Sequence, residues 1–285
     1  MIKSTDINIR DPFVLAYNGK YYMYGTRATN TWDQVSLDTV GFDVYESVDL
    51  ENWSEPKPIF EYFEGFWGTR QYWAPEVHFY NGKFYLFASF IADGYHRGTA
   101  IFVCDTPNGT FKEHSKGAVT PHDWECLDGT LYVENGTPYI IFCHEWTQIN
   151  NGTMCALELS PDLKEPVGEP IYLWAAGDPS WAHDIRDGKG CFVTDGPFFV
   201  KKDNGELICI WSSFSKGEYV EAISRSNNGS IKGKWTIDEK LLYEKDGGHG
   251  MIFKGLDGVS RFTYHYPNTT PYERPYFTEI NIEKL

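Results

Sequence analysis

A short phrase that occurs five times along the chain limits the possible folds more than any other feature. In each copy a polar residue opens a short apolar run, a turn centred on glycine follows, and a second β-rich run comes after it. The turn glycines are separated by 63, 54, 69 and 53 residues, and they are Gly19, Gly82, Gly136, Gly205 and Gly258. Self-similarity at a fixed, long period is typical of repeat architectures.

Each copy continues into two weaker strand-like runs, which predicts four strands per repeat. The first continuation reads FDVYESVDLENWSEPKPIF, and apolar alternation with Asn-Gly or Pro-containing turns is a hairpin signal. Five such units predict an all-β fold, a five-bladed β-propeller with four antiparallel strands per blade around a central channel. No linker or low-complexity stretch divides the chain, so we expect one domain over residues 1–285.

The charge and the cysteines exclude several classes of protein. The chain has 40 acidic and 25 basic residues, and its net charge of −15 disfavours nucleic acid and anionic membranes as partners. The chain contains no run of about 18 apolar residues, so we expect no membrane-spanning helix. The six cysteines form no CxxC pair and lie mostly in strand-like runs, which predicts reduced, buried thiols rather than a zinc site.

The N-terminus shows no apolar segment of the kind found in secretory signals. We therefore expect a cytoplasmic protein as the chain stands, and a secreted or periplasmic one if the chain is trimmed from a longer precursor. Nothing in the sequence indicates an oligomeric state.

The polar residues that open the phrases should meet at the channel if the repeats form blades. They are Asp11, Glu76, Asp128, Asp195 and His249. Carboxylates that face one another suit glycosidic bond cleavage, in which an acid protonates the leaving oxygen and a second carboxylate activates water or attacks the sugar. The acid must keep its proton near neutral pH, which burial or a nearby negative charge achieves. The three aspartates can supply these roles.

The motifs RDPF at Asp11, WAPE at Glu76, LDG at Asp128, TDGP at Asp195 and GGHG at His249 together resemble family 43 of the glycoside hydrolases. The resemblance covers nearly the whole chain and implies a five-bladed propeller and an inverting reaction. It implies that Asp11 is the general base, that Asp128 tunes the pKa of the acid and orients it, and that Asp195 is the general acid. The family includes β-xylosidases, α-L-arabinofuranosidases, arabinanases and xylanases, so the expected substrate is a neutral plant-type β-xyloside or α-L-arabinofuranoside.

One residue departs from the family pattern. The family usually has glutamate before Gly-Pro, where this chain has Asp195, and aspartate reaches about 1.5 Å less far. Proton donation requires hydrogen-bond distance, so Glu125 and Glu145 are reserve candidates for the acid. The substitution also leaves open a second function, a catalytically inactive, carbohydrate-binding propeller.

Further residues are candidates for binding sugar or metal. Aromatic rings pack on the C–H faces of sugars, and Trp73 is the best candidate for a subsite wall. The predicted substrate-binding set is Trp73, Glu76, Arg70, His144, Glu145 and His249, with Trp32, Trp67, Tyr72, Trp146 and Trp181 as further aromatic candidates. The chemistry requires no cofactor. For the central channel, the resemblance leaves two alternatives, a mostly hydrated calcium ion at His249 or no metal ion.

Overall fold

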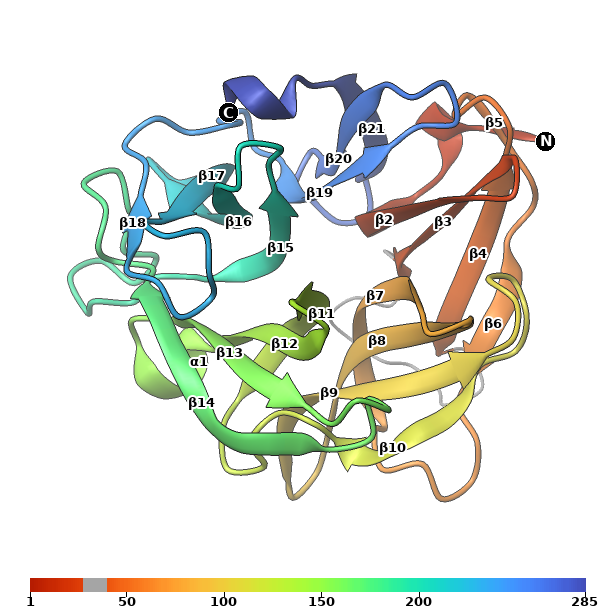
Figure 1. The fold of residues 1–285 in the computed structure, drawn as a ribbon, viewed down its shortest axis with the longest axis horizontal. Coiled ribbons are helices and arrows are strands. Elements are labelled where there is room, and N and C mark those ends of the chain that lie inside the picture. The colour runs from red at the N-terminus through yellow and green to blue at the C-terminus, as the bar shows by residue number, and fades with distance from the viewer. Residues whose placement is uncertain (28–39) are drawn as a thin grey trace.

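The computed structural model describes residues 1–27 and 40–285. Within these residues the chain forms five antiparallel β-sheets arranged around one axis, as Figure 1 shows. The predicted five-bladed β-propeller is confirmed. The second, third and fourth sheets have the four strands expected, whereas the first sheet has six strands and the last has three.

The repeated phrases supply the two strands of each blade that lie nearest to the axis (Figure 1). The innermost strands are β2 (Ile9–Tyr17), β7 (Arg70–Tyr80), β11 (Cys126–Glu134), β15 (Asp195–Lys201) and β19 (Gly248–Lys254). The second strands are β3 (Lys20–Arg27), β8 (Lys83–Ala92), β12 (Thr137–His144), β16 (Leu207–Ser215) and β20 (Ser260–Tyr266). The third strands are β4 (Gly41–Ser47), β9 (Tyr95–Cys104), β13 (Thr153–Leu159), β17 (Glu218–Ser226) and β21 (Arg274–Glu279).

The outer parts of the blades are less regular. The outermost strands of the middle blades are β10 (Lys112–Ala118), β14 (Pro166–Ala175) and β18 (Trp235–Ile237), and the first blade is completed by β1 (Ile2–Lys3), β5 (Asn52–Trp53) and β6 (Lys57–Glu61). The short helices are η1 (Ser4–Asp6), α1 (Trp146–Ile149) and η4 (Ile282–Lys284). No helix in the described part of the chain has the length and apolar character needed to cross a membrane. All six cysteines are free thiols.

Glycine turns fix the register of the inner hairpins. In the first three blades the turn is Asn-Gly, and Asn18, Asn81 and Asn135 have φ values of 47°, 46° and 51°. Two successive residues with positive φ form the tight turn whose twist matches that of the flanking strands, and asparagine and glycine tolerate this conformation best. Tyr17 therefore pairs with Lys20 across a two-residue loop.

The aromatic residues pack mainly between blades. Phe60 of the first blade lies 4.5 Å from Phe102 of the second, measured between ring centroids, and Trp174 of the third blade lies 5.9 Å from Trp211 of the fourth. The ring closes where Phe277 of β21 stacks on Trp53 of the first blade at 5.8 Å. These contacts hold the five inner strands in fixed relation to one another.

Candidate active site

A β-bulge occurs near the start of every innermost strand. At each of these places the pairing register shifts by extra residues. One residue in each bulge has positive φ, and the five are Asp11 (52°), Ala74 (47°), Asp128 (56°), Gly196 (51°) and His249 (51°). Bulges re-aim side chains and are frequent beside active sites.

The bulges correct one detail of the sequence interpretation. Asp11, Asp128 and His249 occupy equivalent positions, as expected. Glu76 lies two residues after the equivalent position, and Asp195 lies one residue before it. Matching the repeated phrases by their first polar residue therefore aligns the five blades only to within two residues.

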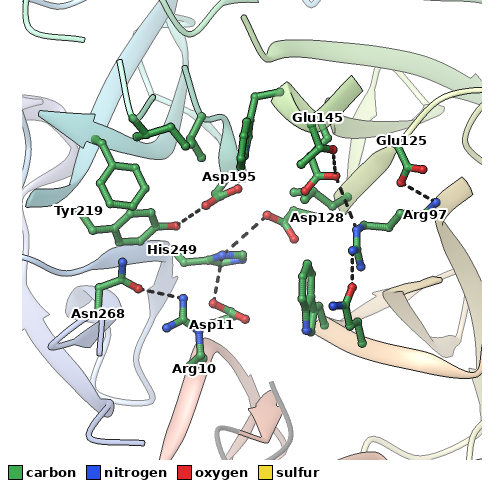
Figure 2. Close-up of a pocket in the computed structure, with 18 of the residues that line it drawn as sticks. Arg10, Asp11, Arg97, Glu125, Asp128, Glu145, Asp195, Tyr219, His249 and Asn268 are labelled. Carbon is green, nitrogen blue, oxygen red and sulfur yellow. Dashed lines mark hydrogen bonds and ion pairs between the residues drawn. The ribbon is translucent and has the colours of Figure 1, made fainter. Parts of the chain in front are cut away.

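The bulges open into a cavity of about 670 Å³ on the axis, a size typical of small-molecule sites. It brings together the three predicted catalytic aspartates and the predicted binding residues Trp73, Glu145 and His249. Figure 2 shows the aspartates, His249 and Tyr219 in one group, with Arg97, Glu125 and Glu145 beside them. The other lining residues are Arg10, Gln71, Ile91, Leu127, Trp146, Thr147, Ile185, Val193, Phe214 and Asn268.

Three predicted binding residues do not line this cavity. Arg70 forms an ion pair with the exposed Asp93 at 2.7 Å. Glu76 pairs with His78 at 2.8 Å, and His144 stacks on Trp124 with ring centroids 4.2 Å apart.

The further aromatic candidates divide between cavity and core. Trp146 lines the cavity, and the guanidinium of Arg186 lies 4.5 Å from its ring centroid. Trp67, Tyr72 and Trp181 pack among other aromatic rings away from the cavity. Trp32 lies outside the described residues.

Asp11 is surrounded by groups that stabilise its negative charge. Its Oδ2 accepts a hydrogen bond from the Thr26 hydroxyl at 2.6 Å, and its Oδ1 lies 3.2 Å from His249 Nδ1. Burial alone would raise the pKa of Asp11, but the charges of His249 and Arg10 outweigh burial and lower the pKa below its ordinary value. Asp11 is therefore ionised across the neutral range.

Asp128 lies in the opposite electrostatic situation. Its Oδ2 accepts one hydrogen bond, from the Gly196 amide at 2.9 Å, and lies 3.8 Å from His249 Nδ1. Burial raises the pKa of Asp128 to about 8; His249 opposes this rise, and the charges of Asp195 and Asp11 add to it.

Asp195 shares this environment. Its Oδ2 accepts a hydrogen bond from Tyr219 Oη at 3.1 Å. Burial raises its pKa to about 6; the positive charge of His249 and the hydrogen bond from Tyr219 oppose this rise, and the negative charges of Glu145 and Asp11 add to it. Since Asp128 and Asp195 disfavour each other's ionisation, the pair retains a proton near neutral pH.

His249 carries the compensating positive charge. Burial lowers its pKa, but Asp11, Asp128 and Asp195 outweigh burial and raise it to about 9. Its ring packs directly on Gly196, where a Cβ atom would come within 2.8 Å of the imidazole. Glycine in TDGP is thus required both by this approach and by the positive φ.

An ion at His249 would take few ligands from the described residues. They contain no group of three or more His, Cys, Asp or Glu side chains placed to hold a metal ion. His249 Nδ1 lies 3.2 Å from Asp11 Oδ1 and 3.8 Å from Asp128 Oδ2, so an ion at this place would keep mostly water ligands.

Sequence reasoning missed a second group of cavity residues. Arg97 lies with its Cζ 3.9 Å from the Trp73 ring centroid, and its Nη2 donates to Gln71 Oε1 at 2.5 Å. Arg10 binds Asn268 Oδ1 at 2.9 Å. Arg10 could have been found, because it directly precedes Asp11. Tyr219 and Arg97 carry no motif, and only the fold brings them to the axis.

Comparison with known proteins identifies the family. The sequence model described as "Glycosyl hydrolases family 43" matches residues 6–282. This chain belongs to that family. The predicted resemblance is confirmed, and the protein is a glycoside hydrolase by family.

Solved structures agree with this assignment. An endo-arabinase from Bacteroides thetaiotaomicron superimposes with a TM-score of 0.90 and 36% identity, over 99% of this chain and 97% of that one. An endo-1,4-β-xylanase from the same organism gives a TM-score of 0.75 and 26% identity, over 98% and 92%.

Two curated relatives match over part of their length. The α-L-arabinofuranosidase 43 of Humicola insolens is 29% identical over 152 residues, and an extracellular endo-α-(1→5)-L-arabinanase of Bacillus subtilis is 24% identical over 179 residues. The matched segments are 51% and 59% of this chain, and they span only 30% and 51% of those proteins.

Proposed function

We propose that this family 43 glycoside hydrolase cleaves α-L-arabinofuranosidic bonds of plant-type polysaccharides or oligosaccharides, with inversion of configuration. The observation that carries the proposal is the opposite pKa displacement of Asp11 and of the Asp128–Asp195 pair within one cavity. Similarity to an endo-arabinase over nearly all of both chains supports arabinofuranoside as the sugar. β-Xyloside cleavage is the second candidate, supported by similarity to the endo-1,4-β-xylanase.

Asp11 acts as the general base in this proposal. Its low pKa keeps it ionised. The hydrogen bond from Thr26 holds Oδ2 in place, and Oδ1 lies beside the imidazole of His249. A water molecule between Asp11 and the sugar gives up a proton to the carboxylate as its oxygen attacks the anomeric carbon. Attack on the face opposite the leaving group inverts the configuration.

Asp195 acts as the general acid, and Asp128 keeps it protonated. The proton on Asp195 passes to the glycosidic oxygen as the bond to the anomeric carbon breaks. The pair retains one proton near neutral pH, and in the reactive form this proton lies on Asp195 while Asp128 is ionised. In that form the negative charge of Asp128 disfavours loss of the proton from Asp195, and Tyr219 orients the Asp195 carboxyl. After the reaction Asp11 holds a proton and Asp195 has lost one, and exchange with solvent restores both.

The carbohydrate-binding alternative rests on aspartate standing where the family usually has glutamate. The buried carboxylates favour catalysis over that alternative, because a site that only binds neutral sugar gains nothing from placing three aspartates in one buried cluster. Glu125 and Glu145 stay the reserve candidates for the acid, since both line the same cavity.

The experiment is a screen of nitrophenyl glycosides and polysaccharides. We expect release from linear arabinan or nitrophenyl α-L-arabinofuranoside to exceed release from the corresponding xylan and xyloside. Proton NMR of the first-formed sugar should show the inverted anomer, and product lengths from arabinan distinguish endo from exo action. Retention of configuration, or tight sugar binding without hydrolysis, would contradict the proposal.

We also propose that the reaction needs no cofactor. All proton transfers are assigned to side chains of this chain, and His249 is occupied by carboxylates. Activity should therefore survive dialysis against EDTA, and a loss restored by added calcium would contradict this part of the proposal.

A further inference from the structure

The backbone amides of the five bulges are bound by a ring of side chains, each from the preceding blade. In four blades that side chain stands seven residues after the turn glycine of the preceding blade. The four contacts are Ala74 N to Thr26 Oγ1 at 2.8 Å, Asp128 N to Ser89 Oγ at 2.9 Å, His249 N to Ser212 Oγ at 2.6 Å and Asp11 N to His265 Nδ1 at 3.2 Å. Each of these residues is a good hydrogen-bond acceptor.

The contact between the third and fourth blades departs from this rule. Seven residues after Gly136 stands Cys143, and a thiol sulfur is a weak acceptor. The amide of Gly196 donates instead to Asp128 Oδ2 at 2.9 Å. Cys143 is fully buried among these groups; burial raises the pKa of its thiol, and the charges of Asp128 and Asp195 raise it further.

The first blade shows what a hydroxyl does at the same place. The Thr26 hydroxyl stands between the Asp11 carboxylate and the Ala74 amide, donating to Oδ2 at 2.6 Å and accepting from the amide at 2.8 Å. The carboxylate of the first blade thus reaches the next amide through a hydroxyl, whereas that of the third blade reaches it directly.

This difference affects the distance between two carboxylates. Gly196 directly follows Asp195 in the chain. The hydrogen bond from the Gly196 amide therefore holds the Asp128 carboxylate close to Asp195. A hydroxyl placed between the Asp128 carboxylate and the Gly196 amide would lengthen the distance between these two groups by one more hydrogen bond, roughly 2.8 Å.

We propose that Cys143 is a positioning residue, which leaves the Gly196 amide free for Asp128 and so holds the Asp128 carboxylate beside Asp195. The catalytic consequence rests on the proposed function. The structural consequence does not depend on the proposed function: the side chain at position 143 decides which acceptor the Gly196 amide binds.

The test compares Cys143→Ser with Cys143→Ala. Serine introduces an acceptor for the Gly196 amide, moves Asp128 away from Asp195 and weakens their repulsion, so the pKa of Asp195 falls. We expect the alkaline limb of the pH–kcat profile to move down by about half a pH unit or more. Alanine has a volume similar to that of serine but carries no acceptor, so Cys143→Ala should leave the alkaline limb of the profile where it is in the wild type. Cys143→Thr, which copies Thr26, is the second variant if serine prevents folding, as judged by melting temperature.

A second readout is independent of activity. The NMR shift of the Gly196 amide should follow the ionisation of Asp128 in the wild type and in Cys143→Ala, and should lose most of that dependence in Cys143→Ser. An unchanged amide titration in the serine and threonine variants would overturn the inference. So would an alanine variant whose limb moves as far as that of serine, because volume would then be the cause. A wild type that hydrolyses no pentoside would sink the proposed function, while the amide titration would still decide the role of Cys143.

Discussion

Asp11 in the first blade and Asp128 in the third stand at the same place in the repeat, yet their pKa values move in opposite directions. Both have positive φ in the bulge of an innermost strand, and both are buried. His249 lies near both carboxylates, at 3.2 Å from Asp11 and 3.8 Å from Asp128. Asp11 also has Arg10 and the Thr26 hydroxyl beside it, whereas Asp128 receives one amide hydrogen bond and lies near the charge of Asp195. The repeat therefore decides where a carboxylate points, and the neighbours that differ between blades decide its protonation.

Asp11→Asn should produce the largest loss. The ionised carboxylate is the base for every substrate, so we expect kcat/KM to fall by about 10³-fold or more, for activated aryl glycosides and natural linkages alike. Steady-state kinetics measure this, and added azide should restore part of the activity by replacing the activated water.

Asp105→Asn is the matched control for this variant, because the Asp105 side chain is 84% exposed and its carboxylate pairs with Lys83 on the surface. It should keep wild-type kinetics. An Asp11→Asn variant that loses activity on poor leaving groups alone would mean that Asp11 is the acid.

Asp195→Asn should cost about 10²-fold or more on substrates with poor leaving groups. The loss should be much smaller on dinitrophenyl glycosides, since a good leaving group needs little protonation. Kinetics on the two substrate classes give the ratio. Wild-type rates for Asp195→Asn on natural substrate, together with loss in Glu145→Gln or Glu125→Gln, would move the acid to one of the glutamates.

The repeat and the inner strands could be predicted from the sequence because turn chemistry and apolar alternation are local. The exact bulge positions could not, since Ala74 and Gly196 carry no polar side chain to mark them. The three-stranded last blade escaped prediction as well: its last strand ends at Glu279, and the chain then enters the short helix η4 in place of a fourth strand. Arg97 and Tyr219 reach the site only through blade packing, which no local pattern reveals.

Asp128→Asn should shift the alkaline limb of the pH–rate profile to lower pH by about one unit. Removing a nearby negative charge lowers the pKa of Asp195, and a unit corresponds to about 1.4 kcal/mol. A pH series of kcat on one substrate measures the shift. An unchanged limb would show that the charge of Asp128 does not contribute to the raised pKa of the acid.

The contrast also affects stability. The pKa of Asp128 rises from an ordinary value of 3.8 to about 8 on folding, so the native state holds a proton that the unfolded chain releases. Stability therefore falls as pH rises through this window, by at most about 1.4 kcal/mol per pH unit for one group. Urea unfolding between pH 5 and 8 should show a shallower decline for Asp128→Asn than for the wild type.

His249 contributes a second decline in the same direction. Its pKa rises from 6.5 to about 9, so the stability it supplies is fully present below pH 6.5 and is lost as pH rises through 9. A wild type that becomes more stable from pH 5 to 8 would contradict both assignments.

The most direct test of the contrast between Asp11 and Asp128 is a ¹³C NMR titration of the aspartate side-chain carboxyls, assigned with the Asp11→Asn, Asp128→Asn and Asp195→Asn variants. We predict that Asp11 titrates below its ordinary range, and that the Asp128–Asp195 pair gives apparent pKa values above 5, with one proton retained near pH 7. An Asp11 carboxyl that is protonated at pH 7, or a pair that is fully ionised at pH 5, would contradict the account.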